Sequence, residues 1–316
     1  MKNLTRSKDN VHFLIDAQNK PRLTVKPGEL FSLETIRADN MYLSRENPNF
    51  KDHAHVMEIQ ANPVTGPVYI ETARAGDVIE VTIEDITLAD SGNEAYCSYI
   101  PGQGVFMNPY APEPFKTQTR WIDASGNILK IPLGKKEFLT PKEPFIGTIA
   151  VAAAQERILS FYANKNIVGN VDCPQIKKGS VVSMPVNVDG ALLSVGDLHA
   201  KQGDGELLGC AVEADGKVTL SVKTLKRGAK KYFNLPQVDS KEFIGSVCSV
   251  DNNIEAAIRG AAFDIIKRIE TCCAIPYIDA YILAGQCLKI QICQMIGNAC
   301  TAFAYIERKL LESLRG

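Results

Sequence analysis

The chain has 316 residues, enough to bury a large core in one domain or in two closely joined ones. Its 35 Lys and Arg residues nearly balance 36 Asp and Glu residues, so no strong net charge favours nucleic acid or an anionic membrane. No apolar run reaches the roughly 20 residues of a membrane helix, and the polar N-terminus lacks the apolar segment of a signal peptide. We therefore expect a cytoplasmic protein that binds a small molecule and forms a homodimer, the commonest oligomer.

Cysteine usage argues against a disulfide framework. The nine cysteines are an odd number and show no Cys-x-x-Cys spacing, and a chain of this size needs no disulfides for stability. We expect free, mostly buried thiols. Cys173 is a candidate reactive thiol because it follows Asp172 in a polar cluster described below, although a packing role is the commoner one for such a residue.

Most of the chain is typical of short β-strands. Turns with glycine precede alternating apolar segments at residues 26–34, 74–83 and 178–186. Further strands are predicted at residues 68–71, at residues 217–224 and, near the end of the chain, at residues 288–292. Because regularly interleaved helices are missing, we predict a mainly β (α+β) fold with an antiparallel β-sandwich or barrel-like body.

Helical periodicity is confined to the C-terminal region. Apolar residues recur every three or four positions from Ile254 to Ile269, with Asp251 and Asn252 as candidate N-caps. A second short helix is expected to begin near Pro276. The sequence therefore predicts a small C-terminal helical segment on the β body.

No internal repeat or clear linker divides the chain. Residues 92–144 are rich in Pro, Gly, Asn and aromatic residues, and we expect long loops there, which often act as lids or binding loops. We expect residues 1–316 to form a single unit, in which an N-terminal β part (1–150) packs intimately against a C-terminal β/α part (151–316).

The segment from Gly196 to Glu206 contains three glycines, three carboxylates and one of the four histidines. Glycine lets the backbone turn sharply, so that several polar side chains converge. Asp197 and His199 lie two residues apart and would share one face of a strand, as would Asp204 and Glu206. Carboxylate and imidazole groups are ligands for hard or borderline divalent metals. The alternative is a solvated hairpin loop.

Other polar residues in the sequence each have two possible roles. Asn170 and Asp172 either complete an oxygen-rich metal site and orient a substrate amide, or form an Asx-turn. Glu213 ends an apolar run and is either a general base with a raised pKa or a water-exposed edge residue. His53 and His55 would share one face of a strand, and we expect them at the surface or at the rim of a pocket.

The double-proline turn at residues 62–67 either shapes the backbone alone or directs Asn62, Thr65 and Glu71 toward a pocket. The chain contains no Gly-x-Ser-x-Gly elbow, phosphate-binding loop, His-Glu-x-x-His helix or dinucleotide-binding glycine triplet. These absences disfavour serine hydrolases, kinases and dehydrogenases. Metal-assisted hydrolysis remains, in which a cation lowers the pKa of water toward about 7.

Four motifs together resemble the acetamidase/formamidase family. They are Asn62-Pro63-Val64-Thr65-Gly66-Pro67, Gly76-Asp77-Val78, Gly169-Asn170-Val171-Asp172 and the segment from Gly190 to Glu206. The resemblance extends over most of the chain and implies a mainly β body. It also implies metal-dependent hydrolysis of a short-chain or small cyclic amide, similar to formamide or acetamide, to a carboxylate and ammonia. The implied divalent metal is zinc first, with calcium or manganese as alternatives.

Carried over by position, the resemblance assigns roles to seven residues, and the residue patterns described above add Glu213 and Thr65 as candidates. The implied metal ligands are Asp172, Asp197 and His199. The candidate catalytic carboxylates are Glu206, Asp204 and Glu213. The candidate substrate-binding residues are Asn170, Gln202 and Thr65.

One departure keeps a second hypothesis open. Family members commonly carry His-Gly-Gly-Asn, whereas this chain has Ile167 and Val168 at the first two positions. The alternative is therefore a non-catalytic or altered relative that binds a small molecule or metal. A structural or assembly role would rest only on the apolar C-terminal region, which we assign to the core or a dimer interface. Hydrolysis through Cys173 without metal would contradict the first hypothesis.

Overall fold

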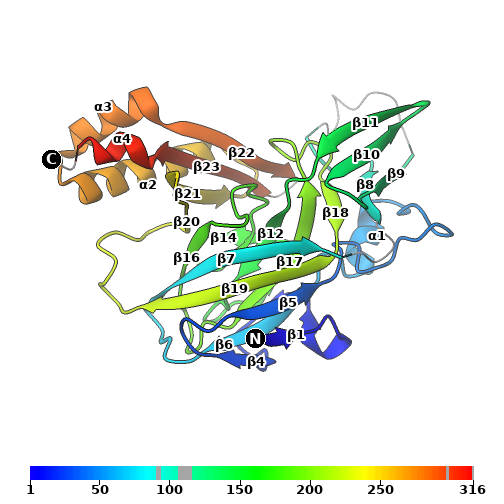
Figure 1. Ribbon diagram of the computed structural model, residues 1–316, viewed down its shortest axis with the longest axis horizontal. Helices are drawn as coiled ribbons and strands as arrows, with labels where there is room; N and C mark the ends of the chain where they lie inside the picture. Colours follow the sequence, from blue (N-terminus) through cyan, green and yellow to red (C-terminus); the bar gives the residue numbers. More distant parts are fainter. Residues whose placement is uncertain (90–93, 106–115, 297–298, 315–316) are drawn as a thin grey trace.

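Two large β-sheets form the body, and helices cover one end of it (Figure 1). The computed structural model describes residues 1–89, 94–105, 116–296 and 299–314. With 42% strand and 15% helix, the chain is mainly β as predicted. Neither sheet closes on itself, so the body is a sandwich and not a barrel.

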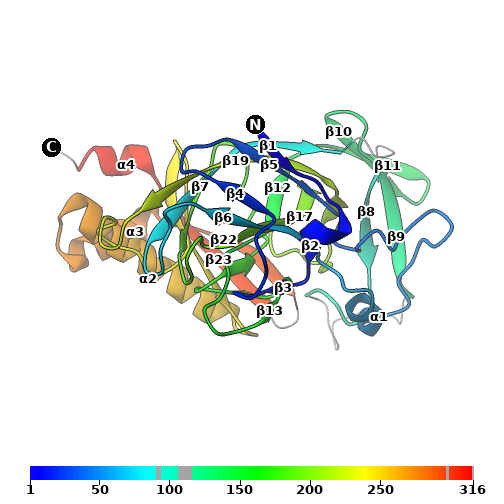
Figure 2. The same cartoon turned by 90° about the horizontal axis from the view of Figure 1, so that it is seen from below.

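The first sheet has nine strands. In spatial order they are β1 (Lys2–Leu4), β5 (Phe31–Thr35), β19 (Gly216–Leu225), β7 (Val78–Leu88), β16 (Val181–Pro185), β20 (Gln237–Asp239), β21 (Phe243–Val250), β23 (Ala299–Glu307) and β22 (Lys289–Ile296). All neighbours are antiparallel except β1 and β5, which are parallel. Figure 2 shows this sheet and the N-terminal strands from below.

The second sheet has twelve strands. Its main path is β11 (Lys136–Pro141), β10 (Ile128–Leu133), β9 (Gln118–Asp123), β8 (Glu94–Tyr99), β18 (Val212–Ala214), β17 (Leu193–Lys201), β12 (Phe145–Ala150), β15 (Val168–Asn170) and β14 (Ala163–Asn164). A branch from β17 contains β6 (Val64–Ile70), β2 (Val11–His12) and β4 (Leu23–Val25). A separate pair contains β3 (Leu14–Ile15) and β13 (Ile158–Leu159).

The helical elements are η1 (Lys8–Asn10), α1 (His53–Glu58), α2 (Ile254–Cys273), α3 (Tyr277–Cys287) and α4 (Arg308–Glu312). The apolar face of α2 packs on β21 and β23, where Ile265 and Ile269 join a cluster with Ile244 and Ile306. This confirms the predicted amphipathic helix. No helix of the described residues has both the length and the apolar character needed to cross a membrane.

Alternation of buried and more exposed residues along β7 and β19 explains the sandwich. In β7, Ile79, Val81 and Ile83 are fully buried, and in β19, Val218 and Leu220 are. Because alternate side chains point to opposite faces, one face of each strand builds the core between the sheets. These strands were predicted from the same alternation.

The central strands β12 and β17 differ, because nearly every residue in them is buried. They pair in antiparallel register, with Ile146 opposite Leu198 and Phe145 opposite His199. Both faces of these strands are therefore covered by protein. Polar side chains on β17 are held away from bulk water, which prepares an electrostatically sensitive site.

Several local predictions were wrong. Residues 92–144 do not form loops throughout, because β8 to β11 occupy much of this stretch; residues 92, 93 and 106–115 lie outside the described part. His53 and His55 lie on helix α1, not on a strand. The side chain of Asp52 accepts a hydrogen bond from the backbone N–H of His55 and caps that helix.

Helix α2 is capped one residue later than expected. The side chain of Asn253 accepts from the backbone N–H of Ala256, so neither Asp251 nor Asn252 is the N-cap. Helix α3 begins after Pro276, as predicted. Strands from both sides of residue 150 pair with each other in each sheet, so the two suggested parts are interleaved.

Candidate active site

A cavity of about 330 Å³ opens beside β17 and β18. One end is polar and contains Asn62, Asn170, Asp172, Asp197, His199, Glu206, Glu213 and Gln294. The wall also contains the apolar residues Phe50, Val56, Met57, Ile100, Phe161 and Ile296. The cavity therefore combines a concentrated set of titratable groups with a hydrophobic surface, as binding sites for small molecules often do.

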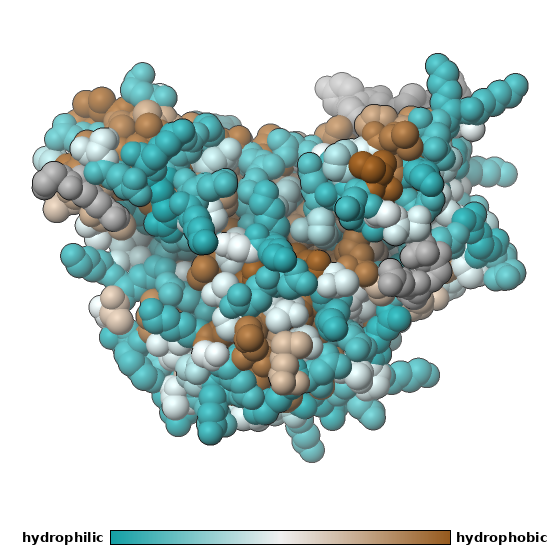
Figure 3. Space-filling model, in the orientation of Figure 1, coloured by the Kyte–Doolittle hydropathy of each residue, from teal (hydrophilic) through white to brown (hydrophobic). Residues whose placement is uncertain are grey.

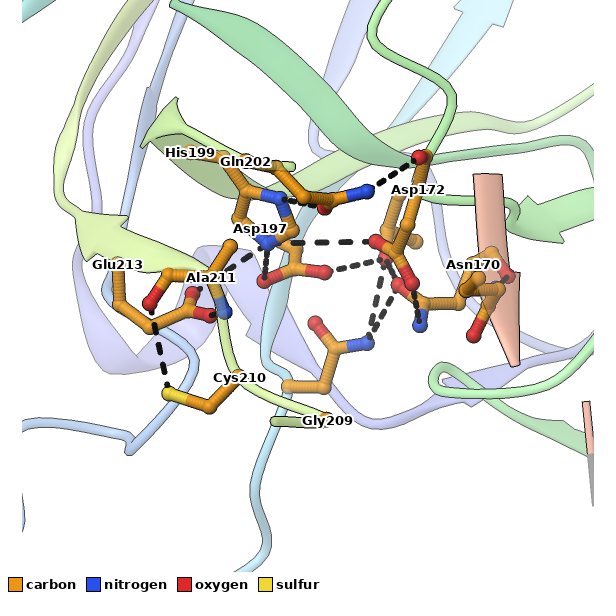
Figure 4. Close-up of polar contacts among 12 residues, drawn as sticks. Asn170, Asp172, Asp197, His199, Gln202, Gly209, Cys210, Ala211 and Glu213 are labelled. Atoms are coloured by element: carbon orange, nitrogen blue, oxygen red, sulfur yellow. Dashed lines mark hydrogen bonds and ion pairs between the residues drawn. The ribbon is translucent and has the colours of Figure 1, made fainter. Parts of the chain in front are cut away.

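Strand pairing brings the central groups together. Asp197 and His199 lie on β17, and Glu213 on β18 is the register partner of His199. The Nε2 atom of His199 lies 3.2 Å from Oδ1 of Asp197, 3.5 Å from Oε2 of Glu213 and 3.9 Å from Oδ1 of Asp172. Figure 4 shows this imidazole surrounded by the three carboxylates. The predicted pairing of Asp197 with His199 is therefore present.

Gly147 on β12 makes room for two of these carboxylates. A Cβ atom at this position would lie 2.6 Å from Oδ1 of Asp172 and 2.6 Å from Oδ2 of Asp197. Real Cβ atoms do not approach so closely. Only glycine at residue 147 lets the two acidic side chains occupy their positions.

Four residues of the site have left-handed backbone conformations. The φ angles are 59° for Asn62, 43° for Asp172, 56° for Asp197 and 46° for Glu206. Such φ values are uncommon for residues other than glycine and cluster at functional sites. All four residues line the cavity.

Gln202 fixes the tautomer of His199. Its Nε2 atom donates to the backbone carbonyls of Asp172 (3.1 Å) and Cys293 (2.8 Å), which sets the orientation of the amide. Its Oε1 atom then accepts from Nδ1 of His199 at 2.9 Å. Because Nδ1 carries that proton, the Nε2 lone pair of the neutral imidazole faces the carboxylates and is free to bind a metal.

Three buried carboxylate oxygens have no hydrogen-bond partner among the described residues: Oδ1 of Asp172, Oε2 of Glu206 and Oε2 of Glu213. Two of them, those of Asp172 and Glu213, lie within ion-pair distance of His199. The other oxygens of two of these groups are held, since Asn170 donates to Oδ2 of Asp172 at 2.9 Å and the N–H of Ala211 donates to Oε1 of Glu213 at 2.9 Å. A buried acceptor without a partner is costly. These oxygens need a proton, a water molecule or a cation.

Protonation reflects the crowding of these groups. Burial is the main cause that raises the pKa of Asp172 to about 7 and that of Glu213 to about 8. Burial and then the charge of Asp172 raise the pKa of Glu206 well above its usual value. Burial alone would lower the pKa of His199, but Glu213 and Asp197 raise it well above normal. Burial alone would raise the pKa of Asp197, but His199 keeps it low.

The donor set fits a divalent metal. Two groups of potential ligand atoms, each within 4.8 Å of one another, share His199: one adds Asp172 and Asp197, the other Glu206 and Glu213. One imidazole nitrogen binds one ion, so an ion on the first group leaves the second pair of carboxylates free. The unpartnered oxygens agree with a cation, because metal binding displaces the protons that such groups otherwise hold.

Several predicted residues lie outside the cluster. Asp204 is exposed and accepts from Gln291, so it does not pair with Glu206, because the chain turns tightly between them. The hydroxyl of Thr65 donates to the carbonyl of Glu34 at 2.7 Å and does not line the cavity. Gln202 supports His199 and is not in the cavity wall. The candidate roles of Asp204 in catalysis and Thr65 in substrate binding have no support in this geometry.

Five other residues considered in the sequence analysis also lie outside the cavity wall. Glu71 and Cys173 are not among the cavity residues, and Cys173 is fully buried. His55 is buried with its ring edge against Tyr42, 4.7 Å between ring centroids, and does not face the cavity. Ile167 packs in a small apolar cluster away from the cavity. Val168, the second residue that departs from the family pattern, lies in the main core, and neither side chain is among the cavity residues.

Sequence analysis missed three contributors to the site. Gly147 lies in an apolar run without a motif, and Thr148 beside it donates to Asn170. Gln294 on β22 donates to the backbone carbonyl of Asn170. Gln294 lies two residues beyond the strand predicted at residues 288–292, and no motif marked it.

Comparison with known proteins shows the family of this chain. A model of the Acetamidase/Formamidase family matches residues 2–166 and 162–296. The chain belongs to this family. The crystal structure of an acetamidase from Bacillus halodurans is similar over 99% of both chains, with a TM-score of 0.87 and 28% sequence identity.

Two curated relatives match this chain over only part of their length. The chain is 26% identical over 254 residues to the formamidase of Methylophilus methylotrophus, covering 66% of this chain and 62% of that protein. It is 25% identical over 263 residues to the acetamidase of Mycolicibacterium smegmatis, covering 66% of this chain and 64% of that one. The matches span less than two thirds of these curated family members.

Replacing Gly147 with alanine should weaken metal binding by about tenfold or more, because the new Cβ displaces Asp172 and Asp197. Isothermal titration with Zn²⁺ measures the effect. Gly203→Ala is the matched control, since no atom lies within 4 Å of a Cβ there. Equal affinity in Gly147→Ala and the native protein would contradict the steric argument.

Metal-free protein should lose stability as pH rises from about 5 to about 8, because the folded state holds protons that the unfolded chain releases near pH 4. The raised pKa values of Asp172 (about 7) and Glu213 (about 8) set this window. Thermal unfolding in chelator measures it, and saturating metal should remove most of the fall. A melting temperature that rises over this range would disprove the sign.

Proposed function

We propose that this protein is a metal-dependent amidase that hydrolyses a short-chain or small cyclic amide to a carboxylate and an amine, which is ammonia for a linear primary amide. The observation that supports it best is the group of three unpartnered carboxylate oxygens around His199 in an open cavity. Membership of a family that contains a formamidase and acetamidases supports the same reaction.

The proposed metal ligands are Asp172, Asp197 and His199. A divalent ion held there would polarise the amide carbonyl and lower the pKa of a water molecule. We propose zinc, because an imidazole with a few carboxylates suits it, whereas calcium prefers six to eight oxygen ligands. Manganese is the alternative that accepts the same mixed set.

Glu213 is the proposed general base. Its Oε1 accepts from the N–H of Ala211, and its Oε2 has no hydrogen-bond partner and lies within ion-pair distance, 3.5 Å, of Nε2 of His199. This oxygen takes the proton of the attacking water and returns it to the departing nitrogen when the C–N bond breaks. The free oxygen of Glu206 is available to hold that water or the substrate N–H.

Asn170 and Gln202 are proposed to act through other groups. Asn170 donates to Oδ2 of Asp172 and so leaves Oδ1 for the metal. Gln202 holds Nδ1 of His199 and so directs Nε2 toward the cavity, where a bound metal would replace the proton on Nε2. Both residues were candidates for substrate binding, and the geometry favours a positioning role.

We also propose that the protein is cytoplasmic and forms a homodimer. Hydrophobic side chains are exposed on α3 and include Ile278, Tyr281 and Ile282. Figure 3 shows hydrophobic residues at the helical end of the molecule. This surface is where a second copy would pack.

Replacing His199 with alanine should abolish both metal content and ammonia release, because it removes the one nitrogen ligand of the proposed group. Elemental analysis and ammonia release from formamide and acetamide, before and after chelation, measure the two effects. His12→Ala, at a histidine outside the cavity wall, is the control. Metal without turnover in the native protein would favour the non-catalytic alternative, and turnover without metal would contradict the metal-dependent mechanism.

Glu213→Gln should retain metal and lower kcat by roughly 10²- to 10⁴-fold, the usual contribution of a general base. Metal content and steady-state kinetics on the same preparation separate the two effects. Asp204→Asn is the matched control at an exposed carboxylate. A Glu213→Gln variant with native kcat would transfer the role to Glu206.

A further inference from the structure

The cavity extends well beyond the group of proposed metal ligands. Its volume of about 330 Å³ falls in the range of roughly 300–1,000 Å³ that is typical of pockets for drug-sized ligands. Acetamide has only four non-hydrogen atoms and would leave most of this space to water. The size of the cavity therefore indicates a substrate with a larger acyl group.

The chemistry of the wall indicates what that group is. Phe50 and Ile100 line the cavity and are almost fully buried, with 5% and 2% exposure. Val56 and Met57 on α1 and Phe161 complete an apolar surface. Water against this wall is displaced favourably by hydrocarbon, because burial of apolar surface is the main driving force for such binding.

No Lys or Arg among the described residues lines this cavity. Its polar lining residues other than the cluster carry no positive charge, and they are Asp39, Asn62, Tyr96, Gln103, Tyr162, Asn170, Cys210 and Gln294. Asp39 is already held by a two-point ion pair with Arg37, with both N–O distances at 3.0 Å. An acyl group that carries its own carboxylate would therefore find no partner here, which favours an uncharged one.

Asn62 supplies an acceptor at the polar end. Its Nδ2 donates to Oγ1 of Thr148 at 3.2 Å, to Oδ1 of Asn170 at 3.1 Å and to the carbonyl of Ser160 at 3.4 Å. These contacts orient the amide so that its Oδ1 is the remaining group, and this buried oxygen has no partner. Asn170 in turn contacts Asp172, so the free acceptor lies close to the proposed metal ligands. An N–H of the substrate would satisfy it.

We propose that the substrate is a primary carboxamide with an uncharged apolar acyl group larger than acetyl, whose hydrocarbon lies against Phe50, Ile100 and Phe161 and whose NH₂ group donates to Oδ1 of Asn62. This inference rests on the proposed amidase function and narrows it. The reaction breaks the C–N bond and forms a C–O bond with water, and it yields a carboxylate and ammonium.

A homologous series of amides tests the inference. Formamide, acetamide, butanamide and hexanamide are compared on the metal-loaded protein by ammonia release and, separately, by equilibrium binding. Each buried CH₂ is worth about 0.8 kcal/mol, or about fourfold, and we expect at least about a twentyfold gain in kcat/KM and in affinity from acetamide to hexanamide. Succinamate, with a charged end, should bind no better than acetamide.

The amide nitrogen is tested with the substrate and not with a variant, because Asn62 also supports Asn170. N,N-dimethylhexanamide has no N–H and should bind about tenfold or more weakly than hexanamide, since it leaves the buried acceptor without a partner. N-methylhexanamide keeps one N–H and controls for added bulk. Equal binding of hexanamide and its dimethyl form would refute the role of Asn62.

The apolar wall is tested with Phe161→Ala. Phe161 is only half-buried, so its truncation should leave the fold intact. The variant should lower the ratio of kcat/KM for hexanamide to that for acetamide by about fivefold or more, as expected for lost apolar contact. Phe138→Ala, at an exposed phenylalanine on β11 outside the cavity, should leave this ratio unchanged.

The results separate this inference from the proposed function. Affinity that rises with chain length without ammonia release would refute the amidase and retain the acyl pocket. Turnover of acetamide with no gain along the series, or a gain in Phe161→Ala as large as in the native protein, would refute the acyl pocket and retain the amidase. Stronger binding of succinamate than of butanamide would overturn the uncharged acyl group.

Discussion

The burial of four carboxylates around one imidazole is the constraint on which the site depends. Like charges placed side by side away from water repel each other unless a proton or a cation lies among them. Asp172, Asp197, Glu206 and Glu213 are all nearly inaccessible to solvent, so each must be held against this repulsion by the surrounding chain. The covered strands β12 and β17 provide the rigidity. The close approach of these carboxylates lowers the stability of the metal-free protein, and it becomes favourable when a metal binds.

Sequence reasoning succeeded where one local rule decides the structure. Alternation with period two predicted β7 and β19 because each buries one face, and it paired Asp197 with His199 because both lie on one strand. The family resemblance was right because it rested on long motifs in order, not on single residues. It also directed attention to Asp172, whose proximity to His199 is a long-range contact that no local pattern specifies.

The errors arose where one residue changes the backbone. Glu206 has a left-handed φ of 46°, and its side chain is buried while that of Asp204 stays at the surface. The prediction that the two residues share one face of a strand was therefore wrong. The Asp52 to His55 segment was too short to distinguish helix from strand by period, and its capping aspartate was the better signal. The space left by Gly147 depends on a neighbouring strand and loop, which the sequence does not place.

Strand β22 supports the site and is translated after all of the site's acidic residues. Gln202 is oriented in part by the carbonyl of Cys293, and Gln294 holds the carbonyl of Asn170, about 120 residues away in the chain. A nascent chain on the ribosome has made all the acidic residues of the site before either contact exists. These acids must therefore stay hydrated during translation, and the centre assembles only after β22 has left the exit tunnel.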